Sequence, residues 1–128
     1  MNLIRKILEL LHIRKKKGGY PKEIAGLCEQ ARGEAKQKML NAGLNVGNEP
    51  DCKVKLLRGE KQVRRIWTVA HAKGNVGGLF YNNTIEIYHN PANKTDVHYK
   101  ALVHEFQHYY AANNGYGMGH ISKLDWRI

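Results

Sequence analysis

The sequence predicts a small α+β domain, because a β-rich middle lies between two segments with helical periodicity. Apolar residues recur every three to four positions over residues 22–42 and 96–112, whereas much of the sequence between them alternates with a period of two. A chain of 128 residues is long enough for one hydrophobic core. We therefore expect one domain over residues 20–128, preceded by a basic amphipathic segment over residues 1–19.

The first helical segment of this domain, residues 22–42, follows Pro21 and ends at Asn41-Ala42-Gly43, where a glycine commonly terminates a helix. Its apolar positions form one stripe, which predicts burial along a single face. The stripe comprises Ile24, Leu27, Cys28, Ala31, Ala35 and Met39. We interpret this segment as a scaffold helix.

The middle of the chain predicts three or four strands, at residues 52–57, 62–71, 76–81 and 84–88. Asn82-Asn83 between the last two strands indicates a tight hairpin. The short connections favour antiparallel pairing, with a mixed sheet as the alternative. We expect this small sheet to pack on the scaffold helix and on the final helix.

The final helix is predicted over residues 96–112, with Asn93 or Thr95 as its N-cap. It contains His104-Glu105-Phe106-Gln107-His108. Side chains four residues apart share one helix face, so His104 and His108 can bind one zinc ion. Glu105 is then placed to act as the general base on a water molecule. The motif predicts one zinc ion per chain and a catalytic role for Glu105.

A catalytic zinc ion needs a third protein ligand and keeps one position open for water. Position 114, six residues after His108, is Asn114, and no glutamate follows the motif. His120 and Asp125 remain as candidates. The glycine-rich loop at residues 115–119 could reverse the chain, so we favour His120 as the ligand. Asp125 could instead accept the N–H of a zinc-bound histidine.

The His-Glu-x-x-His motif is typical of zinc peptidases, so we also consider how a polypeptide substrate could bind and react. Tyr116 and Tyr109 are candidate hydrogen-bond donors to the developing oxyanion. A polypeptide in extended form could add to a strand edge within residues 76–88 through main-chain hydrogen bonds. This mode of binding tolerates many side chains, which predicts broad specificity.

A formal charge of +10 indicates either an anionic partner, namely nucleic acid or a membrane surface, or a solvated basic surface without a dedicated partner. The candidate phosphate contacts are Lys15, Lys16, Lys17, Arg64 and Arg65. No run of 18 apolar residues is present, so we expect no transmembrane segment. The N-terminal residues make a poor signal peptide, and Cys28 and Cys52 are expected to be reduced thiols. We therefore expect an intracellular, cytoplasmic protein.

Four segments of the chain resemble the SprT-like peptidase domain of Spartan-type proteases. They are Gly77-Gly78-Leu79-Phe80, residues 85–91, residues 102–108 and residues 119–126. The resemblance covers residues of about 75–126. It implies a zincin-like fold, zinc ligation by His104, His108 and His120, and proteolysis of DNA-associated proteins.

Two other interpretations remain open at this stage. The chain could be a non-enzymatic, zinc-stabilised protein that binds nucleic acid. It could also be a latent minimal peptidase whose N-terminal helix lies on a membrane surface. Metal content and peptidase activity distinguish these interpretations from an active protease.

Overall fold

A computed structural model describes residues 19–57, 78–88 and 95–127, and for residues 88 and 95–98 it describes the backbone alone. The described elements form an α+β architecture, as predicted. In chain order they are η1 (Lys22–Ile24), α2 (Ala25–Asn41), β1 (Lys53–Leu57), β2 (Gly78–Tyr81), β3 (Thr84–Tyr88) and α4 (Thr95–Asn113). The predicted strand at 62–71, the candidate cap Asn93 and the basic segment up to residue 18 lie outside the described residues.

Helix α2 confirms the predicted scaffold helix, preceded by the short 3-10 turn η1. Four positions of its predicted stripe, Cys28, Ala31, Ala35 and Met39, are fully buried. The helix ends at Asn41, and Gly43 two residues later has a φ of 76°, which glycine adopts without steric cost. The Gly43 N–H donates to the Leu40 carbonyl and the Leu44 N–H donates to the Met39 carbonyl. These hydrogen bonds satisfy two carbonyl groups of the last helical turn.

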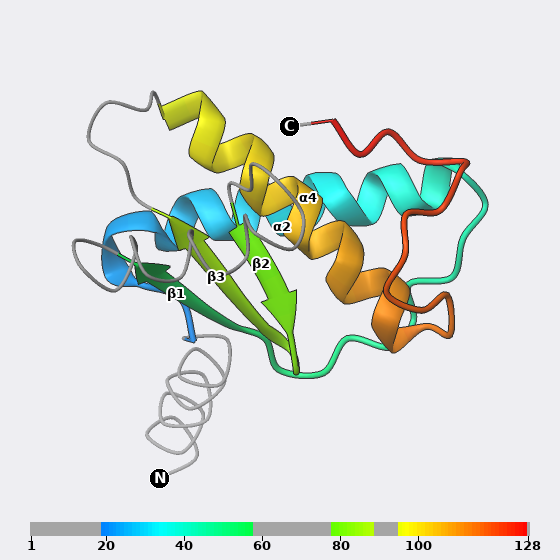
Figure 1. Ribbon diagram of the computed structural model, residues 1–128, viewed down its shortest axis with the longest axis horizontal. Coiled ribbons are helices and arrows are strands. Elements are labelled where there is room, and N and C mark those ends of the chain that lie inside the picture. The colour runs from blue at the N-terminus through cyan, green and yellow to red at the C-terminus, as the bar shows by residue number, and fades with distance from the viewer. Residues whose placement is uncertain (1–18, 58–77, 89–94, 128) are drawn as a thin grey trace, which may run out of the picture.

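The sheet is mixed, with the strand order β1-β3-β2 (Figure 1). Strands β2 and β3 form the predicted antiparallel hairpin, and Asn82 and Asn83 at its turn both have positive φ angles. Strand β1 instead pairs parallel with β3, with Lys53 opposite Thr84. The expectation of antiparallel pairing is therefore wrong for this pair. A parallel pair needs a long connection, and residues 58–83 provide it.

The core lies where α4 contacts both the sheet and α2. The sheet contributes Val54, Phe80, Ile85 and Ile87 to this core, all buried. Phe106 and Tyr109 of α4 meet edge to face with ring centroids 6.1 Å apart, and both are completely buried. Burial of one large apolar side chain contributes about 1.5–3 kcal/mol. Helix α4 is therefore packed against both the sheet and α2, and this packing fixes the position of the helix that carries His104 and His108.

Candidate metal centre

Helix α4 presents His104 and His108 one turn apart on the same face. Their ring centroids are 4.9 Å apart, as the four-residue spacing predicts. Residues on its other faces, including Leu102 and Phe106, are buried in the core. This packing leaves the two imidazoles on the side of the helix that is partly open.

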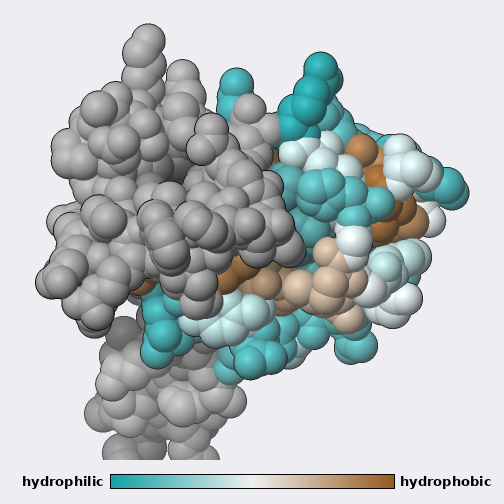
Figure 2. All heavy atoms as spheres, in the orientation of Figure 1, coloured by the Kyte–Doolittle hydropathy of each residue, from teal (hydrophilic) through white to brown (hydrophobic). Residues whose placement is uncertain are grey.

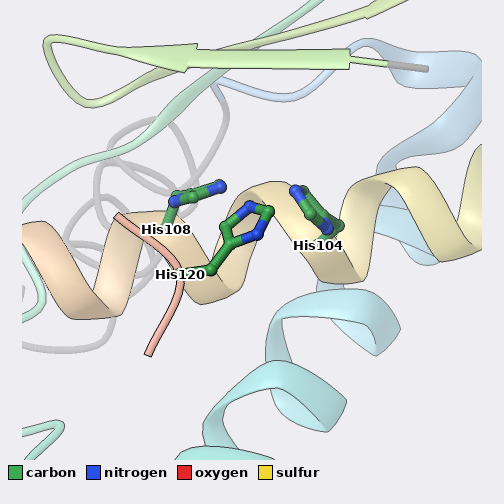
Figure 3. Close-up of side chains that lie close together, drawn as sticks. All are labelled: His104, His108 and His120. Atoms are coloured by element: carbon green, nitrogen blue, oxygen red, sulfur yellow. The ribbon is translucent and has the colours of Figure 1, made fainter. Parts of the chain in front are cut away.

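His120 joins these two histidines from the C-terminal segment (Figure 3). After α4 ends at Asn113, the chain reverses through Gly115 and Gly117, whose φ angles are 85° and 80°. The His120 ring centroid then lies 5.0 Å from those of both His104 and His108. One candidate ligand atom from each histidine lies within 4.8 Å of the other two. The structure thus brings together all three predicted metal ligands.

The donor set and its spacing fit a transition metal such as zinc. Imidazole nitrogens bind zinc at 2.0–2.1 Å, and ligands at that distance in a tetrahedron are about 3.4 Å apart. Small side-chain rotations would therefore close the three nitrogens on one ion. Three imidazoles suit zinc, copper, iron or nickel far better than calcium or magnesium, which prefer oxygen ligands.

A main-chain carbonyl determines which nitrogen of His104 can bind a metal. Nδ1 of His104 lies 2.7 Å from the main-chain oxygen of Trp126. A carbonyl oxygen can only accept a hydrogen bond, so Nδ1 carries the proton and Nε2 keeps its lone pair for the metal. Burial lowers the pKa of His104, the hydrogen bond to Trp126 opposes this shift, and the charge of His120 adds to it. The neutral, metal-binding form of His104 is therefore favoured near pH 7.

Asp125 does not make the contact expected of it. Its carboxylate bonds the guanidinium of Arg127, with an Oδ1–Nε distance of 2.9 Å, and this contact holds the pKa of Asp125 well below its usual range. The carboxylate is neither a ligand nor the acceptor for His104, because the Trp126 carbonyl occupies that place. The sequence suggested the Asp125 carboxylate as this acceptor, whereas the folded chain places the main-chain carbonyl of the next residue, Trp126, there.

Glu105 follows His104 on α4, next to the two candidate ligand histidines in the sequence, and is only 4% exposed. Its side chain packs against strand β2 at Gly78, where an added Cβ would be 3.1 Å from Glu105 Cγ. The absence of a side chain at Gly78 therefore makes room for Glu105. Gly78 belongs to a segment that carried the family resemblance, but the sequence alone does not predict this contact.

Two further residues of this centre were not predicted. Gln107 is a buried polar residue of α4, and its amide nitrogen donates to the Asp125 carbonyl at 3.1 Å. The Trp126 indole stacks on His120, with centroids 4.5 Å apart and planes 9° from parallel. The only sequence signals were a glutamine in a largely apolar helix stripe and an aromatic residue near the third histidine.

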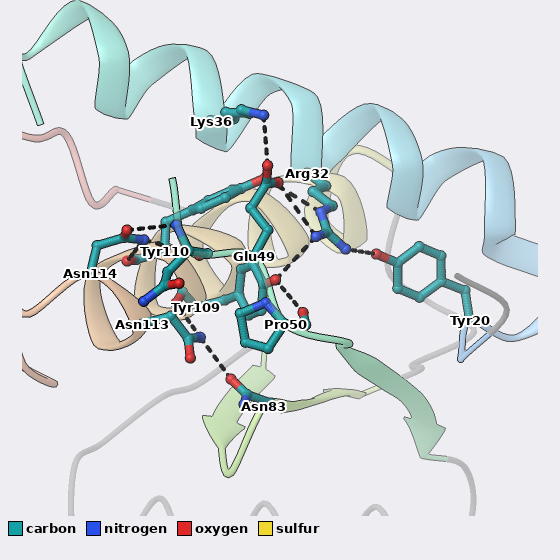
Figure 4. A network of polar contacts seen from close by, with 11 residues as sticks. Tyr20, Arg32, Lys36, Glu49, Pro50, Asn83, Tyr109, Tyr110, Asn113 and Asn114 are labelled. Atoms are coloured by element: carbon teal, nitrogen blue, oxygen red, sulfur yellow. Dashed lines mark hydrogen bonds and ion pairs between the residues drawn. The ribbon is translucent and has the colours of Figure 1, made fainter. Parts of the chain in front are cut away.

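The structure does not bring either candidate tyrosine to the histidines. The Tyr116 hydroxyl accepts a hydrogen bond from the Asn45 N–H at 2.7 Å. Tyr109 is completely buried, donates to the Pro50 carbonyl and accepts a hydrogen bond from Arg32 Nη2 at 3.0 Å (Figure 4). The proposed role of Tyr109 as an oxyanion donor is therefore wrong, because its hydroxyl is part of a structural network.

The predicted phosphate contacts Lys15, Lys16, Lys17, Arg64 and Arg65 lie outside the described residues.

Both cysteines are free, and burial raises the pKa of each thiol to about 12, so both are protonated at neutral pH. Among the helices of the described residues, none has the length and hydrophobicity of a membrane span.

Comparison of the chain with protein-family models, with curated proteins and with solved structures found no match.

Proposed function

We propose that this chain is a zinc-dependent endopeptidase. The observation that carries the proposal is that His120 meets His104 and His108 with candidate ligand atoms within 4.8 Å of one another. Glu105 directly follows the first of the two helix ligands, which is the sequence position of a general base in this motif. Three histidines and a glutamate next to one of them in the sequence are the composition expected of a hydrolytic zinc site.

His104, His108 and His120 would hold the metal, and their neutrality would leave its charge of +2 undiminished. When bound, zinc supplies Lewis acidity, which activates water near neutral pH and polarises a carbonyl group. Three protein ligands also leave one position of a tetrahedral site open for water or substrate. A purely structural zinc site would normally use four protein ligands.

Glu105 would move the proton in this reaction. Its carboxylate would accept a proton from the attacking water and donate it to the nitrogen of the leaving amine. The contact with Gly78 limits the conformations that the Glu105 side chain can adopt. A general base held in one orientation needs no rearrangement at the moment of reaction.

The sheet suggests where an extended polypeptide could bind. Strand β3 is central in the described sheet, so within the hairpin only β2 has an edge that the described strands leave unpaired. Gly78 at the start of β2 is also the contact point of Glu105. Strand addition along β2 would therefore carry a substrate backbone past the general base.

The test combines metal analysis with a variant of the general base. We expect about one equivalent of zinc in protein purified without chelators, and cleavage of an unstructured protein such as casein. Glu105→Gln should retain the zinc and lose activity by about 10²–10⁴-fold, because the amide cannot accept the proton.

Glu23→Gln is the matched control, because Glu23 is exposed in η1 and its loss should leave cleavage unchanged. Protein that neither contains zinc nor binds added zinc would contradict the proposed site. A zinc-loaded wild type without activity would favour the non-enzymatic or latent alternatives, and casein cleavage by Glu105→Gln at the wild-type rate would exclude the proposed mechanism.

The basic charge favours action near nucleic acid as an extension of this proposal. The whole chain carries a formal charge of +10, and Lys53 and Lys55 are exposed on β1. Substrates bound to DNA would be brought to such a protein by electrostatic attraction. DNA-associated proteins are therefore the substrates that we propose to examine first.

A further inference from the structure

The third histidine of the proposed metal site, His120, lies outside the helices and strands of the described structure. His120 is exposed and follows a loop with three glycines, whereas His104 and His108 are held by α4. A side chain on such a loop samples many orientations unless another group restrains it. The position of His120 therefore has to be fixed by contacts outside its own loop.

Trp126 supplies the principal ring contact of His120. The two rings are stacked, with centroids 4.5 Å apart and planes 9° from parallel. The indole also lies 4.6 Å from the His108 ring and 5.3 Å from the His104 ring, measured between centroids. One aromatic side chain thus touches all three histidines, and the stack restricts rotation of His120.

Trp126 is itself anchored to α4 and to its own segment. Its main-chain oxygen contacts His104 Nδ1 at 2.7 Å, and its indole N–H donates to the Ile121 carbonyl at 2.8 Å. One residue earlier, the Asp125 carbonyl accepts a hydrogen bond from Gln107, which is 1% exposed. Two consecutive carbonyls are therefore bound to the helix that carries the other two histidines, as the return of the C-terminal segment past α4 in Figure 1 illustrates.

We propose that Trp126 is a positioning residue of the metal site, whose indole orients His120 while its carbonyl orients His104, with Gln107 anchoring the segment. The inference rests on the proposed metal site and specifies how that site is assembled. Groups that orient metal ligands without touching the metal typically change its affinity by about 10–100-fold.

The experiment measures the affinity of the full chain for Zn²⁺ and Co²⁺, together with the absorption spectrum of the Co²⁺ form. Trp126→Leu removes the stacking ring, and we expect about 10–100-fold weaker binding and an altered Co²⁺ spectrum. Trp126→Phe keeps a ring to stack on His120, so it should restore most of the affinity and the wild-type spectrum. Lys123→Ala, an exposed change in the same segment, is the control and should bind like the wild type.

Three results would overturn the inference: wild-type affinity in Trp126→Leu, an equal loss in Trp126→Phe, or an equal loss in the control. If Trp126→Leu does not fold, Gln107→Leu tests the same anchoring with the indole intact. It should also bind about 10–100-fold more weakly, and wild-type affinity would overturn the inference. Failure of the wild type to bind metal would instead remove the proposed function, so the two failures are distinguishable.

Discussion

At the scale of single residues, the absence of a side chain at one position leaves space for a side chain of the candidate site. Gly78 shows this, because a Cβ there would lie 2.9 Å from Ile87 Cδ1, 3.0 Å from the Glu86 carbonyl oxygen and 3.1 Å from Glu105 Cγ. Real Cβ atoms rarely approach other atoms so closely, so a side chain would displace the sheet or Glu105. The packing around Glu105, the proposed general base, therefore requires a glycine at this position.

Gly78→Ala should therefore destabilise the protein by about 1–3 kcal/mol, as overpacking does, and lower peptidase activity while leaving metal binding intact. Thermal or denaturant unfolding, casein cleavage and metal titration measure the three effects. Gly33→Ala is the matched control, since no atom lies within 4 Å of an added Cβ there and alanine favours the helix by about 0.5–1 kcal/mol. Unchanged stability and activity in Gly78→Ala would show that the contact does not constrain Glu105.

The third ligand gives a second prediction at this scale. His120→Ala should lose most of the zinc affinity, because it removes one of three ligand nitrogens. Asp125→Asn should bind zinc like the wild type, because the Asp125 carboxylate contacts Arg127 and no histidine. Zinc titration against a competing chelator measures both. Strong binding by His120→Ala together with a loss in Asp125→Asn would reverse the assignment.

At the scale of elements, a polar network joins α2, α4 and the loop that follows α2. The Arg32 guanidinium donates to the hydroxyls of Tyr20 and Tyr109 at 2.8 and 3.0 Å and pairs with Glu49 at 3.4 Å (Figure 4). The Tyr110 hydroxyl donates to Glu49 at 2.6 Å. Since Tyr109 and Tyr110 lie one and two residues beyond His108, this network helps to fix the helix that carries two of the candidate metal ligands.

Arg32→Met should lower the free energy of unfolding by about 2–3 kcal/mol, because it removes several hydrogen bonds to a charged and partly buried group. Zinc affinity should change little, because Arg32 contacts none of the three histidines. Lys36→Met is the control, because Lys36 forms a more exposed ion pair with Glu49, which is worth about 0.2–1 kcal/mol. Denaturant unfolding distinguishes the two variants, and equal losses would contradict a central role for Arg32.

At the scale of the whole molecule, charge and surface bear on the choice of partner. Hydrophilic residues cover much of the described surface in Figure 2, and the large exposed apolar side chains among the described residues are Leu40, Tyr116 and Met118. Helix α2 carries acidic as well as basic residues. The formal charge of +10 belongs to the whole chain, including the basic residues outside the described ranges.

We expect sequence-independent binding to DNA that weakens steeply with salt, because each neutralised phosphate releases a counterion. The slope of log K against log salt should approach about −0.9 for each phosphate contacted on duplex DNA. Replacing Lys15, Lys16 and Lys17 together by glutamine should weaken binding to all DNA sequences alike and make the slope shallower. No binding to single- or double-stranded DNA at low salt would remove DNA as a partner.

The sequence by itself determined the local features of this protein. Helical spacing alone places His104 and His108 on one face, because residues four apart are neighbours on any α-helix, and Glu105 directly follows His104 in the sequence. The burial stripe of α2 follows from the same periodicity, and the Asn82-Asn83 turn follows from the tolerance of asparagine for positive φ angles. Loop composition then singled out His120 as the favoured third ligand.

Only the tertiary structure decided the features that join distant segments. The parallel pairing of β1 with β3, the contact of Glu105 with Gly78 and the burial of Tyr109 each depend on residues far apart in the chain. The partner of His104 is a main-chain carbonyl, and every residue has one, so no residue type marks the position of this acceptor. The sequence states which side chains are present. Which main-chain groups lie close enough to orient them depends on how the chain folds.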